Sequence, residues 1–358
     1  MSLRVEALAA RIPWLGAHAG YEQMLRHLPD AGAEVHVTRC FTSTGQIRLG
    51  RVAGWLGREG GRDEPVHAAG ELRYALRTAF RRGAVLHLLY GEVHHPYLAR
   101  WRKAPPDVVA TLHHPPAQWD AWPASLRANL ARLSSAIVPW SSDVERFEQL
   151  VGRGRVRVVR HGVDTDFFRP SPSPATASDE PPRVVYAGQN GRDTALLRAV
   201  VERLAAARPE LRFDLVVRET IRARDAHLRR LADHPSVAWH AGLSDEALRA
   251  LYRRASVLVL PLVTCGATNT LLEALACGLP VVTTDVGGVS DYGGGAVYPT
   301  VPAGDADAMT ALVGAYLDSP ARRDEAGRHG RAFAERELAW PRIAAEHVAA
   351  YRALAGAS

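Results

Sequence analysis

The sequence is poor in cysteine, nearly free of lysine and without any long apolar run. Its 358 residues include three cysteines, Cys40, Cys265 and Cys277, which are odd in number and far apart. This usage favours a reducing cytoplasm over a disulfide framework. Since no run of about 18 apolar residues occurs, we expect no transmembrane helix. We therefore predict a cytoplasmic protein, and a peripheral contact with the inner face of the membrane stays open.

Basic clusters are also lacking. The net charge is +6, and Lys103 is the only lysine, so arginine carries almost all of the positive charge. This modest excess suits an anionic ligand or a loose contact with acidic lipid. It does not suit nucleic acid, because no basic run is interleaved with aromatic residues. The N-terminal stretch carries Arg4, Glu6 and Arg11 and no clean apolar core, so we interpret it as a first strand and loop rather than a signal peptide.

What the sequence does contain is a regular alternation of short apolar runs and amphipathic stretches. The runs read as buried parallel strands because both of their faces are apolar. We predict strands over residues 84–89, 107–113, 135–140, 155–162, 183–188, 212–217, 236–242, 255–261 and 279–285. We predict helices over residues 20–31, 123–134, 193–207, 222–232, 244–254 and 270–277. Such alternation is typical of α/β domains with helices on both faces of a parallel sheet.

A segment rich in proline, serine and alanine, PSPSPATASDEPP at 170–182, interrupts this pattern and reads as an interdomain linker. We therefore predict an N-terminal domain over residues 1–170, a linker over 171–182 and a C-terminal domain over 183–340. Both domains are expected to be doubly wound, with ligands beyond the carboxyl ends of their strands. Two such sheets facing each other would place one site in the cleft between them.

The stretch CGATNTLLEALACGLPVVTTDVGG at 265–288 has the composition of an anion-binding loop. It follows the predicted strand 255–261 and leads into a helix near Thr270, with Asn269 or Thr270 as the N-cap. A helix N-terminus presents free N–H groups and a positive dipole end. The small residues Gly266, Ala267 and Thr268 would let a phosphate approach the backbone. We predict that a diphosphate lies here.

Glu273 admits two interpretations. The spacing Thr270-Leu-Leu-Glu273 is that of a capping box, in which the carboxylate only satisfies backbone donors. Alternatively, the carboxylate contacts a ligand. A carboxylate can also do both.

Four segments, in the expected order along the chain, resemble retaining family-4 (group 1) glycosyltransferases of the GT-B fold. They are RHGVDTDFFRP at 160–170, HPSVAWHAGLSDEALRALYRRASVLVLPL at 234–262, TNTLLEALACGLPVVTTDVGG at 268–288 and LAWPRIAAEHVAAYRAL at 338–354. The resemblance implies two Rossmann-like domains facing across a cleft, with a C-terminal helix at about 341–358 that packs back on the first domain. It also implies a nucleotide diphosphate-sugar donor, retention and no metal.

The resemblance assigns roles to the donor loop. Glu273 would bind the ribose hydroxyls, since a carboxylate can accept from two neighbouring hydroxyls. The backbone around Thr270 and Leu271 would hold the diphosphate. Cys265 stands where the family has a glutamate that contacts the donor sugar. The predicted donor contacts also include the following residues: Gly266, Thr268, Asn269, Gln189, Arg192, Arg218 and Gly242. Gln189 and Arg192 occupy a segment where the family usually has an arginine and a lysine, and Arg192 is our candidate for stabilising the leaving diphosphate. An exposed loop arginine can equally be only solvated.

The N-terminal domain offers two further candidates. Gly20 and Tyr21 follow the first strand and could approach the donor phosphate or the acceptor, although a plain helix start explains them as well. His113 follows the strand 107–113, and the resemblance implies that it contacts the reacting sugar, with His114 as the alternative register. A loop polar group is the simpler interpretation of either histidine. A His-His pair also raises a metal site, but no third ligand lies at a helpful spacing.

Asp164-Thr165-Asp166 matches a metal-binding motif of a different glycosyltransferase fold, but we interpret both carboxylates as turn residues. The sequence therefore predicts a metal-independent, retaining glycosyltransferase. Its donor would be a nucleotide diphosphate-sugar, and its hydroxyl acceptor a glycan, a lipid-linked molecule or a natural product. The alternatives are a non-catalytic nucleotide-sugar or glycan-binding protein and a nucleotide-sugar epimerase.

Overall fold

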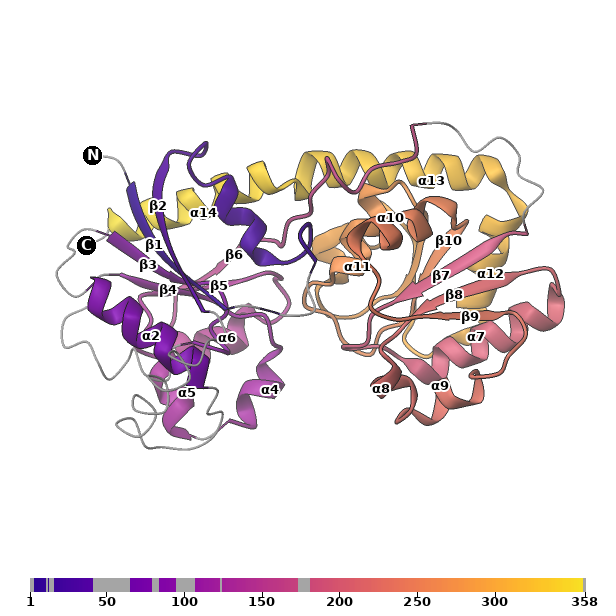
Figure 1. Ribbon diagram of the computed structural model, residues 1–358, viewed down its shortest axis with the longest axis horizontal. Helices are drawn as coiled ribbons and strands as arrows, with labels where there is room; N and C mark the ends of the chain where they lie inside the picture. Colours follow the sequence, from indigo (N-terminus) through magenta and orange to yellow (C-terminus); the bar gives the residue numbers. More distant parts are fainter. Residues whose placement is uncertain are drawn as a thin grey trace. The chain divides into compact units, whose positions relative to one another are not determined.

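The computed structural model describes residues 3–10, 12, 16–40, 65–78, 84–94, 107–122, 124–172 and 181–356. The chain forms two compact units (Figure 1). The first unit comprises Met1–Pro13, Tyr21–His161 and Pro341–Ser358, and the second comprises Trp14–Gly20 and Gly162–Trp340. Each unit holds a parallel sheet with helices, which confirms the predicted doubly wound α/β class.

The first sheet has six strands in the order β2-β1-β3-β4-β5-β6, and every pairing is parallel. Its strands are β1 (Leu3–Ala9), β2 (Ala33–Arg39), β3 (Ala84–Leu88), β4 (Val108–Thr111), β5 (Ser135–Val138) and β6 (Val156–Val158). The helices of this half are η1 (Tyr21–Arg26), α2 (Pro65–Thr78), α4 (Pro116–Asp120), α5 (Ala124–Leu130) and α6 (Val144–Val151). The last helix, α14 (Trp340–Ala355), belongs to the first unit from Pro341 onward.

The second sheet also has six parallel strands, in the order β12-β11-β10-β7-β8-β9. Its strands are β7 (Arg183–Ala187), β8 (Arg212–Val216), β9 (Val237–His240), β10 (Val257–Leu260), β11 (Val281–Thr284) and β12 (Thr300–Val301). Its helices are α7 (Thr194–Ala207), α8 (Glu219–Arg222), α9 (Ala226–Arg230), α10 (Asp245–Arg254), α11 (Asn269–Ala276), η2 (Gly287–Tyr292), α12 (Ala306–Asp318), α13 (Pro320–Phe333) and the π-helix η3 (Ala334–Leu338). In the described part of the chain, no helix is long and apolar enough to span a membrane.

Both faces of the second sheet are buried, as continuous apolar strands require. Val184 and Tyr186 of β7 pack with α7 and α12, whereas Val185 packs with α10 and α11. Successive side chains of a strand point to opposite faces, so one apolar run serves two helical layers. This arrangement fixes the loops at the carboxyl ends of the strands.

Two predicted helices differ in the structure. The segment predicted as one helix over 20–31 is a 3₁₀-helix, η1, that ends at Arg26, and Pro29 disfavours continued helix in the residue before it. The helix predicted over 222–232 is instead the pair α8 and α9, because Asp225 caps a new helix through bonds from the N–H groups of His227 and Leu228. Elements that were not predicted include the strands β2 and β12 and the helices α2, α4, α6, α12 and α13.

The division between the units falls at His161–Gly162, ahead of the proline-rich segment. Residues after Gly162 already pack in the second unit: the Val163 N–H donates to the Leu338 carbonyl at 2.8 Å, and Phe168 is fully buried beside Tyr252. Of the predicted linker, residues 173–180 lie outside the described residues.

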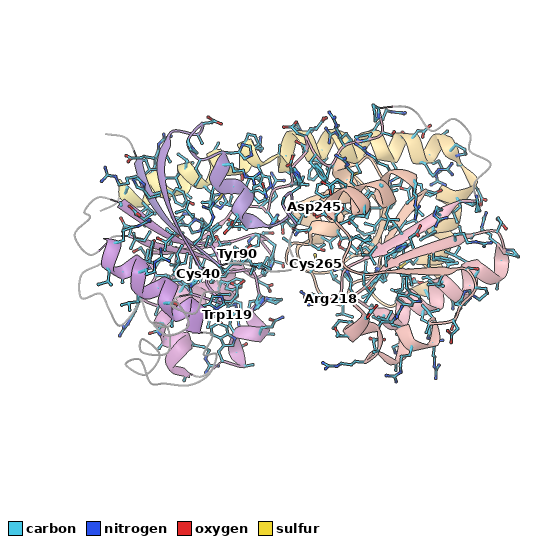
Figure 2. The ribbon with its side chains drawn as sticks, in the orientation of Figure 1. Cys40, Tyr90, Trp119, Arg218, Asp245 and Cys265 are labelled. Carbon is cyan, nitrogen blue, oxygen red and sulfur yellow. The ribbon has the colours of Figure 1, made fainter. Side chains whose placement is uncertain are left out.

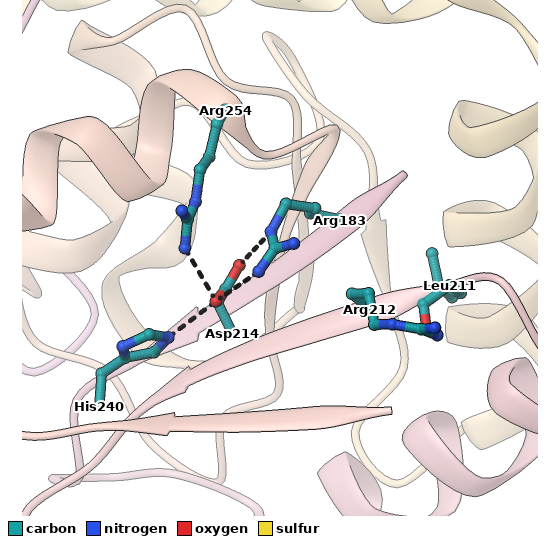
Figure 3. A network of polar contacts seen from close by, with 6 residues as sticks. All are labelled: Arg183, Leu211, Arg212, Asp214, His240 and Arg254. Atoms are coloured by element: carbon teal, nitrogen blue, oxygen red, sulfur yellow. Dashed lines mark hydrogen bonds and ion pairs between the residues drawn. The ribbon is translucent and has the colours of Figure 1, made fainter. Parts of the chain in front are cut away.

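A buried carboxylate ties together the amino end of β7, β8 and the end of β9 (Figure 3). Asp214 is 1% exposed and accepts from Arg183 Nε at 2.8 Å, His240 Nε2 at 2.7 Å and Arg254 Nη2 at 3.2 Å. Burial alone would raise the pKa of Asp214, but the bonds from Arg183 and His240 hold it below its ordinary value. The network fixes edge strand β9 and the end of α10.

Candidate functional site

Two loops meet at the carboxyl ends of the central strands of the second sheet. β7 and β10 are neighbours, and the strand order reverses between them. Ligands of open α/β sheets bind at such a switch point. The loops are joined by two hydrogen bonds, from Val263 N–H to the Gly191 carbonyl at 2.9 Å and from Asp193 N–H to the Pro261 carbonyl at 3.0 Å. Gly191 has a φ of +66°, and a Cβ there would lie 2.4 Å from the Thr264 carbonyl oxygen.

Helix α11 begins directly after the β10 loop with unused backbone donors. Its N-cap is Thr268 and not the predicted Asn269 or Thr270, and the Thr268 side chain makes no capping bond. The Leu271 N–H donates to the Thr268 carbonyl, so it is not available to a ligand, contrary to the predicted role of Leu271. The N–H groups of Asn269 and Thr270 find no acceptor among the described residues. Orphan donors at a positive dipole end favour an anion.

The predicted small loop before α11 is held in shape by the glycine pair that follows β11. The Gly288 N–H donates to the Cys265 carbonyl at 2.7 Å. Gly287 has a φ of +52°, and a Cβ there would lie 2.2 Å from the same carbonyl oxygen. The Cys265 side chain is 6% exposed, and burial raises the pKa of its thiol to about 11. Position 265 therefore offers a neutral, buried group.

Arg192 is a half-buried cation whose hydrogen bonds go only to neutral acceptors. Its guanidinium donates to the carbonyls of Ala187 and Asn190, with Nη1 to Asn190 at 2.9 Å and Nη2 to Ala187 at 3.0 Å. Nη2 also donates to the hydroxyls of Thr268 at 3.0 Å and Thr270 at 3.3 Å. In the described part of the chain no carboxylate pairs with it, and burial lowers its pKa. A cation held at a helix start without a counter-ion is arranged to meet an anion.

The Glu273 carboxylate does not form a capping box. It is 4% exposed, and its Oε2 accepts from the Tyr252 hydroxyl at 3.0 Å rather than from the backbone at the start of α11. Burial raises the pKa of Glu273 to about 7, while the Tyr252 bond acts in the opposite direction and Asp245 adds to the rise. The capping interpretation is therefore wrong, because Thr268 and not Thr270 is the N-cap.

The remaining candidates of the second unit lie on loops at the same edge of its sheet. Arg218, exposed after β8, donates through Nε to Gln189 Oε1 at 2.8 Å. Gly242 follows edge strand β9 with open space around it. Figure 2 shows Asp245, Cys265 and Arg218 along one edge of this unit. The structure thus brings the predicted donor loops to one edge, with Arg192 and α11 at the centre and Gly242 at the periphery.

In the first unit, His113 is held in one tautomer. Its Nε2 lies 2.9 Å from the Leu89 carbonyl, to which it can only donate, so Nδ1 keeps its lone pair. The ring packs between Tyr21 and Tyr90, with centroids at 4.9 and 4.8 Å. Burial lowers its pKa to about 4, so the imidazole is neutral near pH 7. The backbone carbonyl of His114, the next residue, accepts from Trp119 Nε1 at 3.0 Å.

Tyr21 is a packing residue in the structure and not a surface contact. Its side chain is fully buried, and its hydroxyl bonds His347 Nε2 of α14 and Thr111 of β4. The chain of bonds continues from Thr111 to His87 Nε2 at 2.8 Å and from His87 Nδ1 to the Tyr351 hydroxyl at 2.6 Å. The predicted approach of Tyr21 to a ligand is therefore not made by its side chain, and Gly20 is buried beside it.

Three polar residues of the structure were not predicted from the sequence: Tyr252, Glu92 and His18. Tyr252 on α10 gave no local signal, because it sits on the apolar face of a helix. Glu92 is 7% exposed, and its Oε2 accepts from the His113 N–H at 3.3 Å. His18, in the loop that was expected to approach a ligand, stacks on Phe167 at 3.7 Å.

The aspartate motif serves a turn, as predicted for Asp164. Asp164 Oδ1 accepts from the Phe167 N–H at 2.9 Å, and its Oδ2 lies 2.7 Å from His18 Nδ1. The His18 N–H donates to Asp245 at 2.8 Å. Among the described residues, no three His, Cys, Asp or Glu side chains are grouped in a way that could hold a metal ion.

Comparison with known proteins finds a matching family and similar sequences. Residues 181–319 match the family described as Glycosyl transferases group 1. The chain is 31% identical over 206 residues to the MMP alpha-(1->4)-mannosyltransferase of Mycolicibacterium hassiacum, which covers 55% of this chain and 48% of that protein. The chain thus spans about half the length of this curated relative.

Solved structures extend the likeness to the whole chain. Sucrose-phosphate synthase from Thermosynechococcus elongatus matches with a TM-score of 0.74 and 20% identity, over 99% of this chain and 100% of that one. Anabaena HepE in complex with UDP and glucose matches with a TM-score of 0.69 and 14% identity, over 98% of this chain and 100% of that one. The chain has the GT-B fold, and it resembles the group 1 glycosyltransferases, as predicted.

Proposed function

We propose that this protein is a glycosyltransferase that moves a sugar from a nucleotide diphosphate-sugar to a hydroxyl acceptor, with retention and without a metal ion. The observation that carries the proposal is Arg192, a half-buried cation with no counter-ion among the described residues, beside the N–H groups that open α11. The nature of the relatives supports it, since one is named a mannosyltransferase and one neighbour is in complex with UDP and glucose.

The diphosphate would lie against the N–H groups of Asn269 and Thr270, with Arg192 as the partner of its charge. As the glycosidic bond breaks, negative charge grows on the leaving diphosphate. Donors that are already oriented stabilise that charge without reorganisation. A cation and a helix start supply the role that a divalent ion would otherwise fill, which is why we propose a metal-independent reaction. In excess chelator, activity should persist, and a loss restored by a divalent cation would refute this part.

Glu273 would accept hydrogen bonds from the ribose hydroxyls through the oxygen that Tyr252 leaves free. His113 would contact the transferred sugar through Nδ1, which can accept from a hydroxyl because Nε2 already donates to Leu89. The acceptor's proton would pass to the departing phosphate oxygen. Around this centre, the peripheral donor contacts would be Gln189, Arg218, Gly242 and Gly266. The three cysteines are free and buried, which supports the proposal of a reducing, cytoplasmic location.

A non-catalytic nucleotide-sugar-binding protein is the second candidate, and Cys265 favours it. The resemblance places a carboxylate for the donor sugar at that position, whereas the structure holds a buried thiol there. Both candidates bind the nucleotide, so product formation separates them. Transfer, or slow donor hydrolysis, supports the enzyme, and binding without turnover supports the alternative.

A thermal-shift panel of nucleotide sugars, followed by mass detection of released nucleotide for each hit, tests the proposal. Arg192→Gln should weaken binding of the preferred nucleoside diphosphate about ten- to a hundredfold, the range for a hydrogen bond to a charged group. Arg212→Gln is the matched control. Its guanidinium likewise donates only to neutral acceptors, here backbone carbonyls, but it lies at the amino end of β8 (Figure 3), whereas the donor loops follow the carboxyl ends of the strands. Equal affinity for both variants would refute the assignment.

A further inference from the structure

The Glu273 carboxylate is held from the side by a phenol on a neighbouring helix. Glu273 lies on α11 and Tyr252 on α10, and both side chains are buried, at 4% and 1% exposure. The Tyr252 hydroxyl donates to Glu273 Oε2 at 3.0 Å. Among the described residues only Oε2 has a hydrogen-bond partner, so Oε1 keeps its acceptor capacity.

Helix α11 links the two groups of the proposed donor site. The Thr270 hydroxyl in its first turn accepts from Arg192 Nη2 at 3.3 Å. Glu273, three residues further along the same helix, accepts from Tyr252. The helix therefore joins the group proposed for the diphosphate to the group proposed for the ribose.

We infer that Tyr252 is the positioning residue that orients the Glu273 carboxylate for the ribose diol of the donor nucleotide. The inference rests on the proposed function. A tyrosine suits the place because its ring packs in the apolar layer with Phe168, at a centroid distance of 6.4 Å, while its hydroxyl reaches the carboxylate. A phenylalanine would keep the packing and lose only the hydrogen bond.

The hydrogen bond from Tyr252 affects the ionisation of the Glu273 carboxyl group, which packing of the ring alone would not do. A carboxylate must be ionised to accept from both ribose hydroxyls, and a hydrogen bond to the charged form favours ionisation. The titratable neighbours of Glu273 are Asp245 and Tyr252 from α10 and Cys277, which caps the end of α11. Arg192, from the loop after β7, acts on Tyr252 in turn. Burial raises the pKa of Glu273 to about 7 against the effect of Tyr252. Removing the phenol hydroxyl should therefore move the loss of nucleotide binding to higher pH.

The test is calorimetric titration of Tyr252→Phe with a nucleoside diphosphate that binds the wild type, from pH 6 to pH 9. The pH midpoint of binding should rise from about 7 by roughly one unit, as expected for one hydrogen bond to a carboxylate. Binding at pH 7 should therefore weaken about fivefold, because about a tenth of the carboxyl groups would be ionised instead of about half. At pH 9 the affinity should approach that of the wild type.

Two controls sharpen the outcome. Tyr298→Phe removes a hydroxyl from the same apolar layer, where it bonds the Val289 carbonyl at 3.4 Å and not Glu273, so its midpoint should match the wild type. A 2′,3′-dideoxy nucleotide lacks the diol, so Tyr252→Phe should change its binding little. An unchanged midpoint, or an equal loss at every pH, overturns the inference. A wild type that binds none of the nucleotides in the panel instead refutes the proposed function.

Discussion

Two imidazoles buried in the first unit should make that unit sensitive to acid. His347 and His87 are fully buried, and their bonding leaves each as a neutral tautomer. His347 Nδ1 donates to the Ile343 carbonyl at 2.7 Å, so Nε2 must accept from Tyr21. Tyr21 then accepts from Thr111, which makes His87 Nε2 the donor to Thr111 and Nδ1 the acceptor from Tyr351. A proton added to either ring would disrupt this order.

The magnitude follows from the pKa of His347. Burial lowers this pKa from the ordinary 6.5 to about 4. Both states are neutral above pH 6.5, so the group changes stability little there. Below pH 6.5 the unfolded chain takes up the proton first, and stability falls until the folded protein also titrates near pH 4. At about 1.36 kcal/mol per pH unit, the loss from His347 between pH 7.5 and 4.5 is about 2.5 kcal/mol. Burial also lowers the pKa of His87, which adds to the loss.

The assay is urea denaturation of His347→Gln and the wild type at pH 7.5 and pH 4.5. The variant should start less stable at pH 7.5 but lose about 2.5 kcal/mol less than the wild type on acidification. Hydrogen exchange of peptides from β3 and β4 assigns the effect to the first unit. His329→Gln, at an exposed position, is the control and should keep the wild-type difference. If His347→Gln also keeps that difference, the buried neutral imidazole is not the cause.

Three further predictions concern the two units. Glu273→Ala should lose nucleotide affinity while its thermal unfolding stays cooperative, and wild-type binding in a calorimetric titration would contradict a ribose contact. His113→Ala should slow turnover while nucleotide binding is retained, and single-turnover kinetics would show this; unchanged turnover would remove His113 from the reaction. Asp214→Asn removes the buried charge that Arg183 and Arg254 contact and should destabilise the second unit by about 3 kcal/mol, as for other broken buried ion pairs, measured by urea denaturation. A change below about 1 kcal/mol, typical of an exposed pair, would refute a buried pair.

The fold could be predicted from the sequence where local rules decide the outcome. Buried parallel strands are recognisable in a sequence as short apolar runs, and the five strands predicted in the second half are all present. The strand β2 was missed because it lies at the sheet edge, where only Ala33 and Thr38 are buried, so its pattern is not continuous. The 222–232 error came from Asp225, a capping residue inside an otherwise helical pattern.

For the candidate site, the sequence predicted which loops carry the residues but not which side chains they contact. The turn before α11 follows from small residues after a strand, a rule that acts over a few positions. The partner of Glu273 lies 21 residues earlier on another helix, and no local spacing rule joins two helices. The hydrogen bond of Tyr21 to His347 was not predicted for the same reason, since the two residues are 326 positions apart in the sequence.

The charge of Arg192 and the thiol at Cys265 are best understood together. The resemblance places a carboxylate at position 265, and the thiol that stands there is buried and near enough to Arg192 to feel its charge. A carboxylate in that place would serve as the counter-ion of Arg192 and would weaken its attraction for a second anion. With a neutral thiol, the guanidinium keeps its full charge in a site of low polarity, where Coulomb interactions are strongest. In the proposed donor site, a thiol at position 265 would therefore give up a contact to the sugar and strengthen the attraction for the diphosphate.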